Sequence, residues 1–407
     1  VLGRPLHTGG IDSPRPASQR AAAFILTAAM LTTLAAPAFA ATWRIEDGDI
    51  TVKAGETEGT NKVSQGTNKD VVDTDTIITN RDKNTASSHT VTIDAGNDKV
   101  EVTLDNVNIK ADSGSALTSN GDVTLTLKGD NHLTGGNGDT YGGSGIASTG
   151  SLTISGGETD SLTAQGGSGE NGGDGISSKD LTISGGTVTA TGGNSTGIAG
   201  SGGSGIHSGS DVTISGGTVT ATGGDSTGSD GSGGYGIYSS STTTISGGTV
   251  TATGGDSTGS YSSGGYGIYS SGVTISGGST VTANGGSGKD GSGDGIFSFD
   301  PVAISGGTVT AKGGSGEDGS GGRGIISTKS VTISGGTVNA NGGNSGSSNG
   351  GNGIIGSGRV AISGGTVTAN GGNGGPSDSG RAGIDSDRVT ISGGTVTANG
   401  GNGGPSD

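Results

Sequence analysis

The chain has no cysteine and few aromatic residues: one Trp, six Tyr and four Phe among 407 residues. Without cysteine it can form neither a disulfide nor a thiolate metal site. Basic residues are scarce as well, because 20 Lys and Arg stand against 36 Asp and Glu, for a formal charge of −16. Nucleic-acid surfaces need clustered Lys and Arg, so nucleic acid is not an expected partner. Only 27% of residues are hydrophobic, which argues against an ordinary globular enzyme.

Glycine, by contrast, is abundant, with 95 residues. The lack of a Gly-X-Y period excludes collagen and leaves either a disordered chain or a repeat array. The tetrapeptide Ile-Ser-Gly-Gly recurs nine times at steps of 29 to 31 residues, which indicates a repeat array. Its isoleucines are Ile154, Ile183, Ile214, Ile245, Ile275, Ile304, Ile333, Ile362 and Ile391.

Each repeat contains three short strand-like segments. In the fifth copy these are residues 267–270, 273–276 and 280–283, in which aliphatic and polar residues alternate, as in half-buried strands. Gly277 and Gly278 separate the last two segments and supply the positive φ that a tight corner needs. One repeat has too few aliphatic residues to fold alone, so neighbouring repeats must stack. The pattern predicts an all-β, single-stranded parallel β-helix with three short strands per coil of 29–31 residues.

Two alternatives would also account for the composition. A disordered chain is disfavoured because the position after the glycine that opens each repeat is isoleucine in all nine copies. A steric-zipper aggregate is disfavoured because glycine-rich loops interrupt every coil. The isoleucines of this column are Ile146, Ile176, Ile206, Ile237, Ile268, Ile296, Ile325, Ile354 and Ile384.

The N-terminal region reads as a secretory signal peptide. Arg15 and Arg20 precede an apolar run over residues 21–36, and Ala38-Phe39-Ala40 follows it. This order of basic, apolar and small residues predicts cleavage after Ala40 and a secreted or cell-surface protein. We expect no transmembrane segment after that cleavage.

The chain therefore divides into three parts. Residues 1–40 are the leader, residues 41–135 are an N-terminal cap with irregular first coils, and residues 136–407 are the regular repeats. Residues 362–378 and 391–407 are identical in sequence. Because they end within a repeat, we expect the natural sequence to continue past Asp407 and to be truncated here.

Several segments resemble a known family. They are the opening Trp43-Arg-Ile-Glu-Asp-Gly-Asp-Ile-Thr-Val52, the segments 102–109 and 125–136, and the Leu-Thr-Ile-Ser-Gly-Gly-Thr-Val-Thr-Ala blocks. Together they are similar to secreted bacterial proteins of a carbohydrate-binding domain-containing family. The resemblance implies a right-handed parallel β-helix, binding of plant-type polysaccharide, and bound calcium.

The aromatic residues are concentrated in a few repeats. Seven of the nine that follow Ala40 lie between residues 235 and 299. The position after the Gly-Ile pair points outward, so successive coils stack their rings about 4.8 Å apart. Rings and hydroxyl groups of this kind suit sugar binding, although such a ladder also stiffens neighbouring strands. The candidate carbohydrate-binding residues are Tyr235, Tyr238, Tyr266, Tyr269 and Phe297.

Two further patterns recur in the repeats. The third segment presents Thr-x-Thr, which resembles the face of ice-binding solenoids but also suits any solvent-facing strand. Acidic residues recur in the loops, and carboxylates with backbone carbonyls are the ligands that calcium prefers; they also serve to keep a glycine-rich chain soluble. The sequence singles out no metal ligand among these loop acids. They are Asp139, Asp174, Asp225, Asp256, Asp290, Asp294 and Asp318.

No repeat collects an acid, a base and metal ligands in one place. Arg323, Lys329, Arg359 and Arg388 could supply a lyase-type base, and His207 is interpreted as surface filler. Because the paired groups that glycan cleavage needs are missing, we predict a non-catalytic protein that binds extracellular polysaccharide. The alternative is a structural or adhesive cell-surface repeat protein; an ice-binding protein or a polysaccharide lyase is less favoured.

Overall fold

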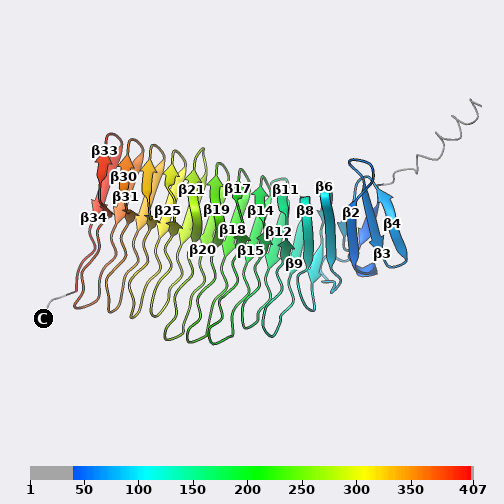
Figure 1. The fold of residues 1–407 in the computed structure, drawn as a ribbon, viewed down its shortest axis with the longest axis horizontal. Coiled ribbons are helices and arrows are strands. Elements are labelled where there is room, and N and C mark those ends of the chain that lie inside the picture. The colour runs from blue at the N-terminus through cyan, green and yellow to red at the C-terminus, as the bar shows by residue number, and fades with distance from the viewer. Residues whose placement is uncertain (1–39, 405–407) are drawn as a thin grey trace, which may run out of the picture. The chain divides into compact units, whose positions relative to one another are not determined.

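The computed structural model describes residues 40–404. The predicted signal peptide lies outside these residues, except for Ala40. The regular secondary structure of the described chain is almost entirely strand, and its one helical element is the short 3-10 turn η1 (Ile45–Asp47). Figure 1 shows coils stacked in sequence order, with long loops extending from one side of the stack. Residues 40–404 contain no helix long and apolar enough to cross a membrane.

Two strands of each coil belong to one sheet of 23 strands. The first strand begins at the isoleucine of the Gly-Ile pair, and the second contains the isoleucine of Ile-Ser-Gly-Gly. First strands are β10 (Ile146–Ser148), β13 (Ile176–Ser178), β16 (Ile206–Ser208), β23 (Ile296–Ser298), β26 (Ile325–Ser327), β29 (Ile354–Gly356) and β32 (Ile384–Ser386). Second strands are β11 (Ser151–Ser155), β14 (Asp180–Ile183), β17 (Val212–Ile214), β24 (Val302–Ile304), β27 (Ser330–Ile333), β30 (Arg359–Ile362) and β33 (Val389–Ile391).

In some coils these two strands merge into one. The sequence predicts a break after Ser270, but β21 runs without interruption over Ile268–Ile275, and β19 does the same over Ile237–Ile245. Where the two strands join, β19 has only Ser and Thr, and β21 has Ser and Gly272. β19 and β21 pair with each other through a register shift between Ser239 and Thr242. The upstream strands β6 (Val91–Asp105) and β8 (Leu117–Lys128) are also continuous.

The third strand of each coil forms a separate parallel sheet of 11 strands, one strand per coil. Valine pairs with valine and alanine with alanine from β15 to β34. The strands are β7 (Asn108–Lys110), β9 (Asp130–Thr134), β12 (Ser161–Gln165), β15 (Thr187–Thr191), β18 (Thr218–Thr222), β20 (Thr249–Thr253), β22 (Thr280–Asn284), β25 (Thr308–Lys312), β28 (Thr337–Asn341), β31 (Thr366–Asn370) and β34 (Thr395–Asn399).

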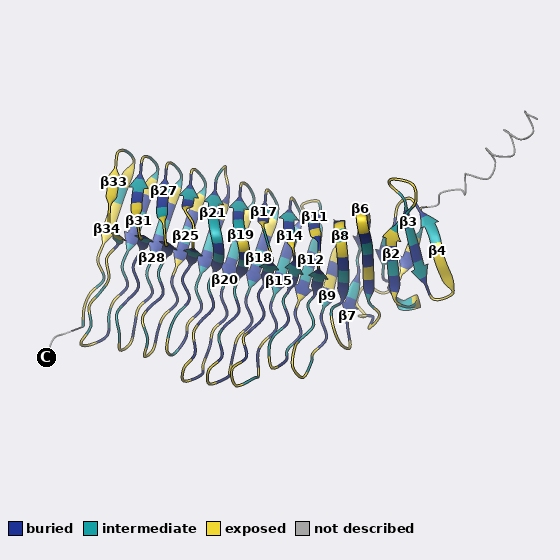
Figure 2. Cartoon of the chain, in the orientation of Figure 1, coloured by how far each residue is buried: buried dark blue, intermediate teal, exposed yellow. Residues whose placement is uncertain are grey.

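These pairings confirm the predicted parallel β-solenoid with three strand segments per coil. The core is a set of aliphatic columns, because identical positions of successive coils pair in register. Ile176 pairs with Ile206, which pairs with Ile237, and each of these side chains is fully buried. Figure 2 shows buried and exposed residues alternating along the strands. The corner glycines also behave as expected, since Gly186 has φ +79° and Gly277 has φ +66°.

The glycine-rich loops do more than return the chain to the next coil. They form an ordered layer. Each loop leaves the third strand as an outgoing arm and comes back as a return arm, and the two arms of all coils lie side by side. The N–H of Gly203 donates to Gly193 O at 2.9 Å, and the N–H of Gly224 donates to Gly203 O at 2.8 Å. We call this layer the glycine arms (residues 135–145 and the corresponding loop of each later coil).

Backbone packs directly against backbone in the glycine arms. Consecutive N–H groups donate in different directions: Gly192 bonds to Thr222 O of the next coil, whereas Gly193 bonds to Gly173 O of the preceding return arm. A Cβ atom added to any of Gly192, Gly193, Gly202 or Gly203 would lie under 3.0 Å from a carbonyl oxygen. Glycine is therefore required here by close packing, not by a positive φ.

The first described residues form a different arrangement. β2 (Ile50–Ala54), β3 (Asn61–Gln65) and β4 (Asn68–Asp73) are antiparallel neighbours, while β1 (Thr42–Arg44) pairs with β5 (Ile77–Thr79) in parallel. Trp43 is 6% exposed, and its indole N–H donates to the carboxylate of fully buried Asp73 at 2.8 Å. β2 also pairs with β6, so the cap continues directly into the first coils.

Candidate functional site

The five predicted aromatic residues lie on three adjacent coils, where the return arms of the glycine layer enter the first strands. Tyr238 pairs with Tyr269, which pairs with Phe297, in the position after each Gly-Ile pair. Tyr235 and Tyr266 occupy the position before the same glycine. All five side chains are half-buried, and we refer to them as the aromatic ladder.

Stacking within the ladder brings the ring faces together. The centroids of Tyr238 and Tyr269 are 5.4 Å apart with an interplanar angle of 9°, and those of Tyr269 and Phe297 are 5.0 Å apart with the same angle. Tyr235 stacks on Tyr266 at 5.7 Å. These spacings are somewhat longer than the predicted inter-strand distance. Because the rings cover one another's faces, the ladder presents mainly ring edges and phenol hydroxyls to a ligand.

Phe299 extends the ladder sideways. Its ring meets Phe297 edge to face at 4.9 Å and Tyr269 at 5.5 Å, and it is 45% exposed. Burial raises the pKa of the Tyr266 hydroxyl to about 12, with a further contribution from the nearby Asp294 carboxylate. The Tyr266 hydroxyl therefore stays protonated and acts as a neutral hydrogen-bonding group at any physiological pH.

A histidine and a carboxylate close one end of the ladder. His207 meets Tyr238 edge to face at 4.7 Å, and its Nδ1 lies 3.1 Å from Asp174 Oδ2. The hydrogen bond to Asp174 raises the pKa of His207, against an opposing effect of burial. The second oxygen of Asp174 accepts the backbone N–H of Ser204. His207 is thus held in a fixed orientation beside the ladder by Asp174 and Tyr238.

A second carboxylate–cation pair closes the other end. Asp294 directly precedes the Gly-Ile pair of its coil, the position that Tyr235 and Tyr266 occupy in the two preceding coils. Its side chain is buried, with 2% of the residue exposed. Its Oδ2 lies 3.7 Å from Arg323 Nη1, and its Oδ1 accepts the Arg323 backbone N–H at 2.6 Å. Burial raises the pKa of Asp294 to about 6, although Arg323 acts in the opposite direction.

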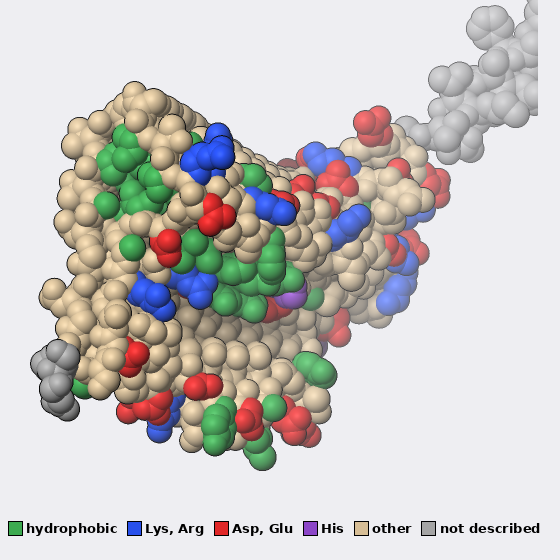
Figure 3. Space-filling model, turned by 60° about the vertical axis from the view of Figure 1, so that its left-hand side comes forward, with side chains coloured by type: hydrophobic (Ala, Val, Ile, Leu, Met, Phe, Trp, Pro, Cys, Tyr) green, Lys and Arg blue, Asp and Glu red, His purple; other side chains and the backbone are tan. Residues whose placement is uncertain are grey.

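The ladder and its two end pairs make one continuous surface. Figure 3 shows hydrophobic side chains gathered on this face, with a histidine at the margin and both basic and acidic side chains close by. The His207 side chain is 43% exposed and the Arg323 side chain is 41% exposed. The surface therefore offers apolar ring edges along its length and hydrogen-bond donors at its ends.

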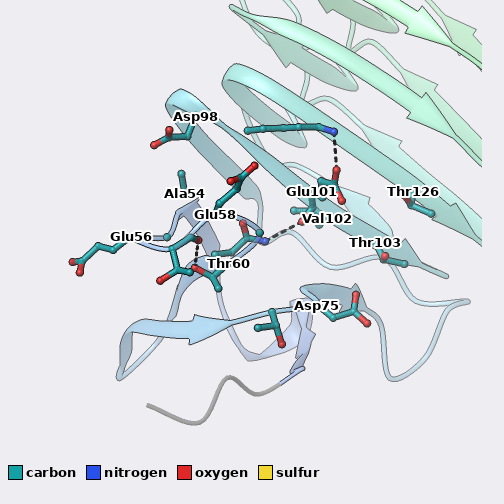
Figure 4. Close-up of a pocket in the computed structure, with 16 residues that line it drawn as sticks. Ala54, Glu56, Glu58, Thr60, Asp75, Asp98, Glu101, Val102, Thr103 and Thr126 are labelled. Carbon is teal, nitrogen blue, oxygen red and sulfur yellow. Dashed lines mark hydrogen bonds and ion pairs between the residues drawn. The ribbon is translucent and has the colours of Figure 1, made fainter. Parts of the chain in front are cut away.

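A separate cavity of about 800 Å³ lies between the β2–β3 turn and β6. Figure 4 shows its lining, in which threonine and acidic side chains predominate. Two of the acids are already paired, Glu56 with Lys62 and Glu101 with Lys99, each at 2.7 Å. The cavity holds no aromatic residue, so it suits sugar binding less well than the ladder.

The predicted calcium ligands do not come together. Within residues 40–404 no group of three or more His, Asp or Glu side chains is placed to hold a metal ion. Asp225 and Asp256 lie in adjacent arms, but each uses a carboxylate oxygen to accept the backbone N–H of the next coil, from Asp256 and Ser287 respectively. No calcium site is therefore named among the described residues.

The comparisons with known proteins agree with the fold. A sequence-family model described as a beta helix repeat matches residues 212–237, 244–268, 273–296, 302–325, 331–354, 360–387 and 389–404. Nearly every match spans one coil, from a second strand to the next Gly-Ile pair. No curated protein and no solved structure matches the chain. The chain thus contains β-helix repeats, a class that describes architecture and not a particular ligand.

Proposed function

We propose that the protein is secreted and binds an extracellular polysaccharide through the aromatic ladder, without cleaving it. The observation that carries the proposal is the gathering of Tyr235, Tyr238, Tyr266, Tyr269 and Phe297 on three coils of a chain otherwise dominated by Gly, Ser and Thr. Clusters of exposed aromatic side chains mark contact surfaces, and tyrosines combine apolar area with a hydroxyl group.

The stacked rings determine how a glycan would lie. Because the ring faces are already in contact, a sugar would rest across the ring edges and exchange hydrogen bonds with the phenol hydroxyls. Equivalent rings recur at 5.0 to 5.7 Å along the stack, so the surface is suited to an extended, linear glycan lying parallel to the solenoid axis. Loss of any one ring then removes one of several similar contacts, which is why the test uses a double substitution.

The experiment compares Tyr238→Ala/Tyr269→Ala with a matched control, Tyr141→Ala/Tyr261→Ala. The control removes two tyrosines that are 73% and 74% exposed and lie outside the ladder. Purified variants are screened against a polysaccharide panel by pull-down and isothermal titration calorimetry. We expect the ladder variant to lose at least about tenfold in affinity, equivalent to about 1.4 kcal/mol, and the control to bind as the wild type does.

Equal binding by both variants would remove the ladder from consideration as the binding site. Release of new reducing ends or of an unsaturated sugar from any bound polysaccharide would contradict the non-catalytic part of the proposal. Secretion is tested separately, by the N-terminal sequence of the protein recovered from the culture medium, which should begin at Ala41.

A structural or adhesive role is the second candidate, and the face-to-face contacts of the rings favour it. Stacked aromatic pairs stabilise neighbouring strands by about 0.5–1.5 kcal/mol each beyond their buried area. If the ladder serves only this purpose, Tyr238→Ala/Tyr269→Ala lowers the melting temperature while no polysaccharide in the panel binds the wild-type protein.

A further inference from the structure

The outer face of the 11-stranded sheet carries almost no charge. From β12 to β31, the first, third and fifth residues of every strand point outward and the two between them are buried. β34 has the same alternation in sequence, but its Val396 is only half-buried and its Ala398 is exposed. These outward residues are Thr, with some Asn, one Ser and one Gln, and Lys312 is their single charged member. We call this surface the threonine face.

Other surfaces of the same coils are charged. Asp180, Asp211, Arg359 and Arg388 lie at or beside the starts of second strands, and Asp225, Asp230, Asp256 and Asp290 lie on the glycine arms. The whole chain is 14% charged with a net charge of −16. Two copies of such a chain repel each other over most of their surface. The threonine face is the exception, because on it two copies can approach without placing like charges together.

The threonine face is also regular. Thr220 pairs with Thr251 and Thr251 with Thr282, without a register shift. At the C-terminal coils the amide of Asn370 donates to Asn341 and that of Asn399 donates to Asn370, at 2.7 and 2.8 Å. A second copy has the same inter-coil repeat by necessity, so side chains of the two faces could interdigitate in every coil, as in stacked β-sheets about 10 Å apart.

The size of the face is sufficient for a dimer. Nine strands at about 4.8 Å and five residues at about 3.3 Å give roughly 700 Å² per copy. A stable protein interface buries about 800 Å² per partner. We propose that the protein associates with a second copy of itself through the threonine face, leaving the aromatic ladder of each copy free. This association is independent of the proposed polysaccharide binding.

Lysine substitutions test the proposal. Thr220→Lys/Thr251→Lys/Thr282→Lys places three charges at the middle of the threonine face. The matched control, Thr213→Lys/Thr244→Lys/Thr274→Lys, changes the outward threonines of the second strands in the same three coils. Sedimentation velocity at micromolar concentrations should give a dimer for the wild type and the control. For the first variant the dimer dissociation constant should rise at least about 100-fold, since juxtaposed like charges are strongly unfavourable.

Circular dichroism and melting temperature establish that both variants fold, and Thr251→Lys alone provides a milder change that should still weaken the dimer. A wild-type protein that remains monomeric at all concentrations overturns the proposal. So does a dimer that the control disrupts as much as the threonine-face variant. A third outcome is a monomeric protein that shows thermal hysteresis or is retained on a crystalline polysaccharide. If the threonine-face variant loses that activity, the face binds a crystal surface and not a second copy, and the proposal is overturned.

Discussion

Replacing Gly224 with alanine should destabilise the protein although the change is small and lies in a loop. Gly224 belongs to an outgoing arm, and a Cβ atom on it would come within 3.0 Å of the Gly193 carbonyl oxygen and carbon. Both atoms belong to backbone, so neither can move aside alone. The arm must shift, which disturbs the hydrogen bonds from Gly224 N–H to Gly203 O and from Gly234 N–H to Gly224 O, both 2.8 Å long.

The expected cost combines two effects. Two weakened backbone hydrogen bonds contribute about 0.5–1.5 kcal/mol each, and overpacking contributes about 1–3 kcal/mol. We therefore expect Gly224→Ala to lower the free energy of unfolding by about 2–6 kcal/mol, measured by urea denaturation followed by circular dichroism. Hydrogen exchange should show faster exchange at the amides of the arms on either side.

Gly278→Ala is the matched control. Gly278 lies at an exposed corner, its φ is not positive, and a Cβ atom there would meet nothing within 4 Å. The alanine should be neutral or stabilise by up to about 1 kcal/mol, because it restricts the unfolded chain. If Gly224→Ala proves as stable as Gly278→Ala, the arms are loosely packed and the close-packing argument is refuted.

Two other substitutions address buried carboxylates. Because burial raises the pKa of Asp294 to about 6 from 3.8, the folded chain retains a proton that the unfolded chain has released between those values. Stability should therefore fall as the pH rises from about 4 to about 6, by at most about 3 kcal/mol. Asp294→Asn should remove this pH dependence in melting experiments and should be more stable than the wild type at pH 7. The control Asp256→Asn, at an exposed position, should leave the pH dependence in place. A pH dependence that Asp294→Asn does not change would contradict its assignment to Asp294. Trp43→Phe leaves the buried Asp73 carboxylate without its indole donor and should cost about 1–3 kcal/mol, measured by circular dichroism because Trp43 is the sole Trp. An unchanged midpoint would mean that water replaces the indole.

The solenoid could be predicted from the sequence because its core depends on a few aliphatic positions that repeat. Ile176 and Ile206 recur at the step of one coil, and the structure pairs them directly. Alternation around these residues also distinguishes inward from outward positions. The merger of two strands in β19 and β21 was not predicted, because the serines and Gly272 of this stretch are residues typical of a turn.

The ordered packing of the glycine arms could not be predicted, for a physical reason. Sequence patterns report where side chains are buried, but the arms bury backbone against backbone. A signal was present nonetheless: Gly192-Gly193 opens a loop and Gly202-Gly203 closes it, and the same two pairs recur in most later coils. Glycine pairs that recur at fixed positions indicate close approach of another chain segment. A flexible loop would not need glycine at fixed positions.

The end pairs of the aromatic ladder were overlooked because their members were considered separately. Asp174 and Asp294 were interpreted as loop acids, Arg323 as an isolated base and His207 as filler. Comparing the residue before each Gly-Ile pair would have placed Asp174, Tyr235, Tyr266, Asp294 and Arg323 in one column. What the sequence could not supply is the orientation of the rings, since the alternation that turns Tyr238 outward does not fix whether its face or its edge meets the solvent.

The glycine arms and the aromatic ladder depend on each other. Tyr235 directly follows Gly234, whose N–H bonds to the neighbouring outgoing arm, and the carbonyl of Tyr235 accepts the N–H of Gly205. The carbonyl of Tyr266 accepts from Gly236 in the same way. The backbone that carries these two rings is therefore held by the last bonds of the glycine layer. Displacement of an arm by Gly224→Ala should consequently reduce polysaccharide affinity as well as stability, and Gly278→Ala should affect neither. Full affinity in a destabilised Gly224→Ala protein would show that strand pairing alone positions the ladder.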